Sequence, residues 1–183
     1  ENINKLIENR NRLAVEGSKD ITFWINVNQS IISLDKSIRN YIDFEGERDL
    51  VTSYTSWKKN IVNEDIIEYD KEILNIIRNK ESEFFLIEYR MKNKTGGITW
   101  FQSKGKKTYE TNGDIFLYGS ISDITERKEI ELKQEYLTYT DEVTGNANRR
   151  YFLKKIDEFI SKDNYKLAII FIDLDFKFFF SFF

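Results

Sequence analysis

Three residue types with distinctive chemistry are missing from this 183-residue sequence: it contains no cysteine, no histidine and no proline. Without cysteine the chain can form no disulfide, no thiolate nucleophile and no cysteine-ligated zinc or iron–sulfur cluster. Without histidine it can carry no Ser–His–Asp relay, no histidine-ligated haem and no phospho-accepting histidine. Any metal ion bound here must therefore have oxygen ligands, which suits Mg²⁺ or Ca²⁺.

A strong charge imbalance and long apolar runs are missing as well. The 28 lysines and arginines nearly balance the 31 aspartates and glutamates, and the net charge is -3. This balance argues against a nucleic-acid-binding surface spread over the chain. No apolar run reaches the roughly 18 residues of a membrane span, and no signal peptide is recognisable. We therefore expect a fragment of a cytoplasmic protein, with no nucleic-acid partner and no membrane span in this chain.

The first 80 residues have the patterns of one helix, two strands and a second helix. Apolar residues among charges predict a helix over 2–16 that Gly17 ends. The segments 21–27 and 30–34 are rich in β-branched and aromatic residues and predict a pair of short strands. Short helices and loops are expected over 36–61. The helix that starts at Asn63 carries one apolar stripe, made of Ile66, Tyr69, Ile73, Ile76 and Ile77.

Three alternating segments, 83–91, 98–109 and 114–122, predict three consecutive antiparallel strands. Asn112-Gly113 between the last two is a strong hairpin signal. Two strands, helices and then three strands indicate an α+β domain built on a single sheet. The lysines at 104, 106 and 107 are expected to be a solvated or edge-protecting cluster rather than an anion site.

Four short segments of this region resemble the PAS family of sensor domains. In chain order they are RLAVEGSKD (12–20), Trp57 followed by VNED (62–65), ITWFQSKGKK (98–107) and GSISDITERK (119–128). Asn63 and Glu64 stand where the family usually has histidine and proline. The resemblance implies a PAS fold over 18–124, an antiparallel sheet flanked by short helices, after an N-terminal helix over 1–17. The alternative is an unrelated sheet domain.

The ligand of such a PAS domain cannot be identified from the sequence. Composition excludes a cysteine–flavin adduct and a histidine-ligated haem. An apolar pocket for a small organic ligand is one interpretation of several residues on the predicted sheet, and ordinary core packing is the other. These residues are Phe23, Ile25, Phe85, Ile87 and Leu117.

A linker helix is predicted over 125–140, directly after the DITERK segment. Either Asp123 or Thr125 can cap its N-terminus. Apolar residues spaced 4, 3 and 4 apart form one heptad seam, and they are Leu132, Tyr136, Tyr139 and Val143. The seam favours a homodimer through the PAS domain and the linker helix, or else a helix packed on its own domain.

The segment YTDEVTGNANRRYF (139–152) resembles the opening motif of GGDEF domains, the diguanylate cyclases, whose pattern is D-x-L-T-G-L-x-N-R-R-x-F. Matching residues are Asp141, Thr144, Gly145, Asn148, Arg149, Arg150 and Phe152. Val143 and Asn146 replace the two leucines. The plainer interpretation is a helix that Asn148 caps after a glycine turn. By the resemblance, 141–183 is the beginning of an α/β GGDEF domain.

The apolar run 167–172 predicts a buried strand that ends at Asp173-Leu174-Asp175. The resemblance implies that Asp173 and the Leu174 carbonyl bind Mg²⁺, and that Phe176 and Lys177 lie near the phosphates of GTP. Without the resemblance, an aspartate at a strand end is more often a helix cap or a surface charge. One residue of the family spacing is missing before Phe176.

The GG(D/E)EF signature itself is absent, and the sequence finishes with FFFSFF. We therefore expect a truncated GGDEF fragment that makes no cyclic di-GMP alone, from a parent that makes it from two GTP. The alternative is a non-catalytic PAS module for dimerisation or ligand binding, with a vestigial output. A sensor kinase is disfavoured because no histidine follows DITERK.

Overall fold

The computed structural model describes residue 17 and residues 20–43, 51–79 and 81–161. The chain divides into two compact units, Glu1–Ile130 and Glu131–Phe183, which are described separately. The predicted helix over 2–16 and the predicted strand over 167–172 lie outside the described residues. No helix among the described residues is both long enough and apolar enough to cross a membrane.

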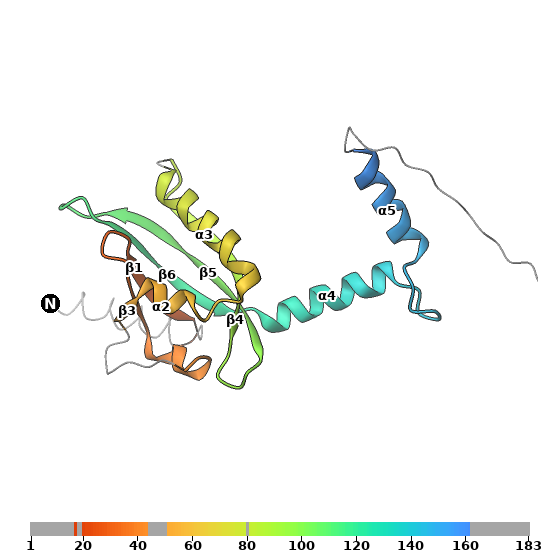
Figure 1. The fold of residues 1–183 in the computed structure, drawn as a ribbon, viewed down its shortest axis with the longest axis horizontal. Helices are drawn as coiled ribbons and strands as arrows, with labels where there is room; N and C mark the ends of the chain where they lie inside the picture. Colours follow the sequence, from red (N-terminus) through yellow and green to blue (C-terminus); the bar gives the residue numbers. More distant parts are fainter. Residues whose placement is uncertain (1–16, 18–19, 44–50, 80, 162–183) are drawn as a thin grey trace, which may run out of the picture. The chain divides into compact units, whose positions relative to one another are not determined.

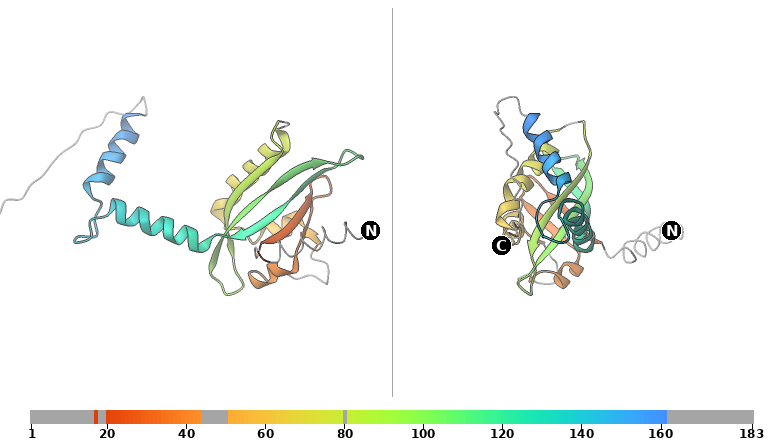
Figure 2. Two further views of the ribbon diagram at one scale, coloured as in Figure 1. Left: turned by 180° about the vertical axis from the view of Figure 1, so that it is seen from behind. Right: turned by 90° about the vertical axis from the view of Figure 1, so that its right-hand side faces the viewer.

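In the described residues of the first unit, six strands form one antiparallel sheet with the order β3-β2-β1-β6-β5-β4 (Figure 1). The strands are β1 (Ile21–Asn26), β2 (Ile31–Leu34), β3 (Val51–Ser53), β4 (Phe84–Lys92), β5 (Ile98–Tyr109) and β6 (Ile115–Asp123). The three long strands β4, β5 and β6 form a twisted meander, seen from behind in Figure 2. The predicted pair of short strands, the three consecutive antiparallel strands and the Asn112-Gly113 turn are confirmed, and Gly113 has a φ of 87°.

Helices cover one face of the sheet, and the hydrophobic core lies between that face and the helices. The helices are η1 (Lys36–Asn40), α2 (Tyr54–Lys58) and α3 (Asn63–Arg78). The period-two pattern of β4 puts Phe85, Ile87, Tyr89 and Met91 on this face, and all four are buried. The apolar stripe of α3 packs against the same core, with Tyr69 and Ile73 buried. The predicted α+β class is confirmed.

Two glycines lie directly opposite each other at the centre of the sheet. Gly105 of β5 pairs with Gly119 of β6, and Phe85 and Phe23 are the next residues outward in the same row. A Cβ on Gly105 would meet the Tyr118 carbonyl oxygen and come within 2.8 Å of the Phe85 ring. The two phenylalanine rings lean over the glycines, with centroids 6.3 Å apart. The glycines therefore make room for this aromatic pair.

The segment before α3 covers one end of the edge strand β4. The Val62 N–H donates to the Arg90 carbonyl (2.9 Å), and the Lys92 N–H donates to the Asn60 carbonyl (2.8 Å). The unpaired edge groups of β4 are satisfied there. Short helices over 36–61 were predicted, but strand β3 was not, because three residues are too few for an alternating pattern.

The prediction of a solvated lysine cluster was wrong for Lys107. Its side chain is 2 % exposed, and its ammonium donates to the carbonyls of Ile76 (2.8 Å) and Asn79. These carbonyls are at the C-terminal end of α3, where a helix leaves acceptors without partners and attracts positive charge. Lys104 and Lys106 remain about half exposed and pair with Asp20 and Glu83. Of the three lysines of β5, only Lys107 has its side chain on the inward face of the sheet, and only Lys107 is buried.

Helix α4 (Thr125–Tyr139) crosses the boundary between the units, and α5 (Arg149–Ile160) belongs to the second. The predicted linker helix is present, but the heptad seam is shorter than expected. Val143 is 93 % exposed and lies in a turn, because the helix ends four residues earlier. Gly145, with a φ of 69°, completes that turn.

Candidate functional site: the root of helix α4

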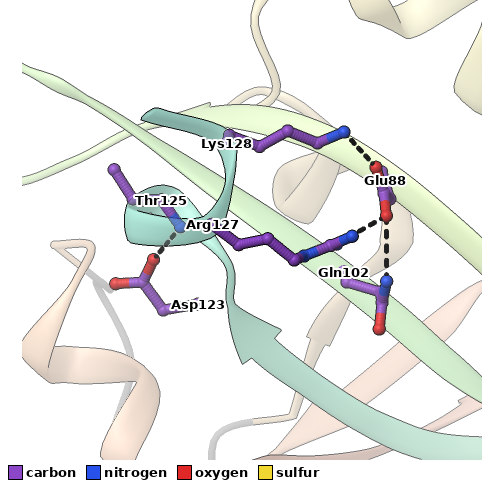
Figure 3. A network of polar contacts seen from close by, with 6 residues as sticks. All are labelled: Glu88, Gln102, Asp123, Thr125, Arg127 and Lys128. Atoms are coloured by element: carbon purple, nitrogen blue, oxygen red, sulfur yellow. Dashed lines mark hydrogen bonds and ion pairs between the residues drawn. The ribbon is translucent and has the colours of Figure 1, made fainter. Parts of the chain in front are cut away.

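The passage from β6 into α4 is fixed by hydrogen bonds to strand β5. The Ile124 N–H donates to the Trp100 carbonyl (2.9 Å), and the Trp100 N–H donates to the Thr125 hydroxyl (3.0 Å). Of the two candidate caps, Asp123 takes the capping role, since its carboxylate accepts the Thr125 N–H (2.9 Å; Figure 3). The first turn of α4 is therefore anchored to the sheet by both backbone and side chains.

Glu88 joins this first turn to the outer face of the sheet. Arg127 and Lys128 reach from α4 to the Glu88 carboxylate on β4 (Figure 3). Each of the two nitrogen–oxygen distances is 2.7 Å. The Gln102 amide of β5 donates to the same carboxylate at 2.9 Å. The Glu88 side chain is 25 % exposed, so these bonds are partly shielded from water. Charge-assisted hydrogen bonds of this length are stronger than neutral ones.

The network keeps Glu88 ionised. The Lys128 and Arg127 donors, with Gln102 adding to them, lower the pKa of the Glu88 carboxyl to about 2, although partial burial opposes the shift. The carboxylate therefore stays negative at any physiological pH. The bonds of Glu88 to Arg127, Lys128 and Gln102, here called the Glu88 clamp, are therefore not broken by protonation in the physiological pH range.

A second set of contacts connects the first turn of α3 to strand β4, close to Glu88. Asp65 accepts two side-chain hydrogen bonds from Arg90 at 2.6 and 3.0 Å, together with the Arg90 backbone N–H at 2.9 Å. These bonds lower the pKa of Asp65. The Arg90 guanidinium lies 5.5 Å from the Trp100 ring centroid, and the Lys128 ammonium lies 5.4 Å from it. Trp100 is thus in contact with cations from both β4 and α4.

The five predicted pocket residues are brought together, but little space remains between them. Phe23, Ile25, Phe85, Ile87 and Leu117 all border one interior cavity of about 10 Å³. A cavity of that volume holds at most about one water molecule. In this conformation the centre of the domain has no room for an organic ligand.

Four of the predicted GGDEF motif residues meet in the turn that joins α4 to α5. Asp141 accepts the backbone N–H (2.9 Å) and the hydroxyl (2.8 Å) of Thr144, which lowers its pKa, and Gly145 closes the turn. Asn148 caps α5 through the Tyr151 N–H (3.0 Å), as the plainer interpretation predicted. Its amide also donates to the Thr138 carbonyl at 2.9 Å, at the end of α4.

The remaining predicted site residues are not brought to a common centre. Arg149 and Arg150 are exposed in the first turn of α5. Asp173, Leu174, Phe176 and Lys177 lie outside the described residues. Among the residues that the structure describes, no three acidic side chains are grouped so that they could hold a metal ion.

Sequence reasoning singled out Arg127 and Lys128 within the DITERK segment but missed their partner. The available signal was the position of Glu88 and Arg90 on β4, where the alternation of the strand leaves them on the outward face. Two charged residues of opposite sign on that face, opposite Gln102 and Trp100, mark a polar contact surface. Their pairing with α4 depends on the register of the sheet, which the pattern does not give.

Comparison with known proteins agrees with this geometry. Residues 31–121 match the family described as the PAS fold. This segment is a PAS domain. A sensory box histidine kinase/response regulator from Burkholderia thailandensis has a similar structure, with a TM-score of 0.56 and 21 % identity over 70 % of this chain and 98 % of that one. The N-terminal domain of a diguanylate cyclase with a PAS/PAC sensor from Marinobacter aquaeolei gives 0.50 and 16 %, over 60 % and 98 %.

A curated relative is matched over a shorter stretch. The cyclic di-GMP phosphodiesterase PdeR of Escherichia coli is 34 % identical over 76 residues, which are 41 % of this chain. The match spans 12 % of the length of that protein. The solved structures support the fold of the PAS domain, and PdeR adds a relative from cyclic di-GMP metabolism. Together they identify a sensory signal-transduction domain.

Proposed function

We propose that this PAS domain controls a GGDEF output through helix α4, in a cytoplasmic protein that makes cyclic di-GMP from two GTP. The observation that carries the proposal is the anchoring of α4 to the sheet by Glu88, with the GGDEF-like segment 139–152 directly after the helix. A helix clamped at its first turn transmits a shift of the sheet along its length, because it is stiff.

Two of the similar proteins support a link to cyclic di-GMP. The PdeR protein acts in cyclic di-GMP metabolism, and the Marinobacter protein is a diguanylate cyclase with a PAS/PAC sensor. The motif residues Asp141, Thr144, Gly145 and Asn148 support it through the compact turn that they build after α4.

The route of the signal runs through contacts that are all within the PAS unit. A movement of α3 changes the position of Asp65 and so of Arg90, which lies against Trp100. Lys128 lies against the same ring and pairs with Glu88. Displacement at one end of this series alters the contacts that hold α4 at the other end.

The chemistry of the output is proposed from the resemblance alone. In the complete protein, Asp173 and the Leu174 carbonyl would bind Mg²⁺, and Phe176 and Lys177 would lie beside the phosphates. The metal ion would neutralise charge on GTP, so that a 3′ oxygen of one GTP could displace pyrophosphate from the α-phosphorus of the other. Because the sequence contains no GG(D/E)EF signature, we expect no cyclic di-GMP from this chain by itself.

Joining residues 1–140 to the complete GGDEF domain of an active diguanylate cyclase tests the control function. We expect the rate of cyclic di-GMP formation in the fusion to change when Glu88→Gln breaks the clamp, with the GTP KM unaltered. The matched control is Glu83→Gln, which removes an exposed partner of Lys106 far from α4 in the sheet. Equal rates in the three fusions would refute control through the clamp.

A second candidate function is a non-catalytic homodimerisation module. Helix α4 buries none of its residues within the described structure and exposes large apolar side chains, namely Ile130, Leu132, Tyr136 and Leu137. Of these, Leu132 and Tyr136 are four residues apart on one side of the helix, where they suit contact with a second copy of the chain. Analytical ultracentrifugation of the full chain tests it: we expect a dimer that Leu132→Asp dissociates, and a strict monomer at high concentration would remove this role.

A further inference from the structure

A cleft of about 310 Å³ opens beside the filled centre of the PAS domain. It lies between α2, α3 and the ends of β1 and β6. Its walls are mainly apolar and include the side chains of Val27, Leu74 and Ile77. Small-molecule sites in proteins have this size and this predominance of apolar walls with a few polar groups.

The polar end of the cleft is an ion pair. The Lys58 ammonium donates to both carboxylate oxygens of Asp70 at 2.8 Å, and both residues line the cleft. An ammonium has three N–H donors, and the two bonds to Asp70 leave one of them over. The pair as a whole has no net charge. It therefore offers one hydrogen-bond donor to an incoming oxygen atom without attracting an anion.

We propose that this cleft binds an uncharged, mainly apolar molecule that carries one carbonyl or hydroxyl oxygen. The apolar body fills the space between Leu74, Ile77 and Val27, and the oxygen accepts the remaining N–H of Lys58. A carboxylate is disfavoured because it would lie against Asp70, and an amine because it would lie against Lys58. The hydrogen bond to a charged donor gives the ligand its orientation.

The cleft offers a ligand a binding place next to the core of the PAS domain, whose own cavity is too small for one. Ile25, Ile73 and Leu117 border both the 10 Å³ cavity and the cleft, so they separate the core from the ligand space. Asp70, Ile73, Leu74 and Ile77 belong to α3, the helix whose first turn contacts Arg90 through Asp65. The site is thus on the element from which the proposed signal starts. That link to signalling rests on the proposed function, whereas binding itself does not.

Calorimetric titration of the full chain with three probes of equal length tests the site: 2-nonanone, nonanoate and nonylamine. We expect saturable binding of the ketone in preference to the two charged probes. Leu74→Trp, at a position 46 % exposed, fills the cleft and abolishes binding. Ile67→Trp is the matched control, because Ile67 is 79 % exposed on the same helix and does not line the cleft. Circular dichroism verifies that both variants fold.

Two further variants test the chemistry. Lys58→Met removes the donor and should weaken ketone binding about tenfold. Asp70→Asn frees the charge of Lys58 and should strengthen nonanoate binding about tenfold. Absence of binding by all three probes, ketone binding unchanged in Leu74→Trp, or affinities unchanged in Lys58→Met and Asp70→Asn would each overturn the inference.

The same titration separates this inference from the proposed function. Amide hydrogen exchange in the first turn of α4 is measured with and without saturating ketone. Binding with altered exchange supports both. Binding with unaltered exchange establishes the site and contradicts its coupling to α4. Absence of binding overturns the site and leaves the fusion experiment to decide the control function.

Discussion

The Glu88 carboxylate of β4 lies 2.7 Å from the Lys128 ammonium of α4, and the same lysine lies 5.4 Å from the Trp100 ring. One side chain therefore contacts two neighbouring strands. Arg127 makes a second bond to Glu88, so consecutive residues of the helix hold one carboxylate. The bond pattern fixes the rotation of the first helical turn as well as its position.

Glu88→Gln is expected to loosen this turn. The amide keeps a hydrogen-bond acceptor but loses the charge that Arg127 and Lys128 neutralise. We expect the free energy of unfolding of the PAS domain to fall by about 1–2 kcal/mol, and amide exchange over 126–130 to accelerate. Chemical denaturation and hydrogen exchange measure the two effects. Glu83→Gln, which breaks a half-exposed pair, should change neither, and equal behaviour of the two variants would contradict the clamp.

The same carboxylate predicts part of the acid sensitivity of the domain. Folding lowers the pKa of Glu88 from about 4.5 to about 2, so its contribution to stability is complete above pH 4.5 and is lost as the pH falls toward 2. The free energy of unfolding should therefore decline more steeply over this window in the wild type than in Glu88→Gln. Asp65 and Asp35, whose pKa values are also lowered within the same unit, leave a residual slope in the variant. Parallel urea titrations at several pH values measure both slopes.

Much of the fold was predictable because apolar residues recur in the sequence with the period of a strand or of a helix. The strand over 98–109 has the predicted bounds, and helix α3 begins at the predicted Asn63. Their alternating or helical apolar pattern states which side is buried. Strand β3 and the turn that places Val143 outside α4 were not predictable in this way. The first is three residues long, and the second depends on how Asp141 and Gly145 form a turn.

The candidate site was predictable only in part. The DITERK segment pointed to Arg127 and Lys128 through a family resemblance, whereas Glu88 entered only when the sheet register was known. Lys107 illustrates the same limit, because its position in a run of lysines suggests solvent and its inward-facing register buries it. Contacts between distant segments are decided by packing, which local patterns do not contain.

Lys107→Met is expected to destabilise the PAS domain although it replaces a charge by an apolar group of similar length. The carbonyls of Ile76 and Asn79 would lose their donor at the end of α3, at a cost of about 2–3 kcal/mol. Lys106→Met removes only a half-exposed ion pair and should cost less than about 1 kcal/mol. Thermal and urea unfolding compare the two variants, and equal losses would show that the buried bonds contribute nothing.

Asn148 is expected to matter to two helices at once. Asn148→Ala removes both the cap of α5 and the bond to the Thr138 carbonyl, and a lost cap costs about 1 kcal/mol. Asn148→Ser retains an acceptor for the Tyr151 N–H but not the donor to Thr138. Exchange of the Tyr151 amide should therefore accelerate in the alanine variant and remain slow in the serine variant. Fast exchange in both would mean that the cap requires the bond to α4.

Gly105→Ala tests the aromatic pair at the centre of the sheet. The added methyl group would meet the Tyr118 carbonyl and the Phe85 ring, so β5 and β6 must separate or the ring must move. We expect a loss of about 1–3 kcal/mol or more in the free energy of unfolding. Gly17→Ala is the control, since a Cβ there meets nothing within 4 Å. An unchanged free energy of unfolding in Gly105→Ala would show that the two phenylalanine rings can move apart without cost.

The position of Trp100 has an optical consequence. Its indole ring lies beside Arg90 and Lys128, and the emission of tryptophan shifts with the charges around it. Trp57 is buried in the core and Trp24 lies on another strand, so phenylalanine at those two positions leaves Trp100 as the single tryptophan, beside the first turn of α4. Trp100 is therefore an intrinsic fluorescent reporter of the junction between the sheet and helix α4. Displacement of either cation should shift its emission, which can be followed in real time without an added label.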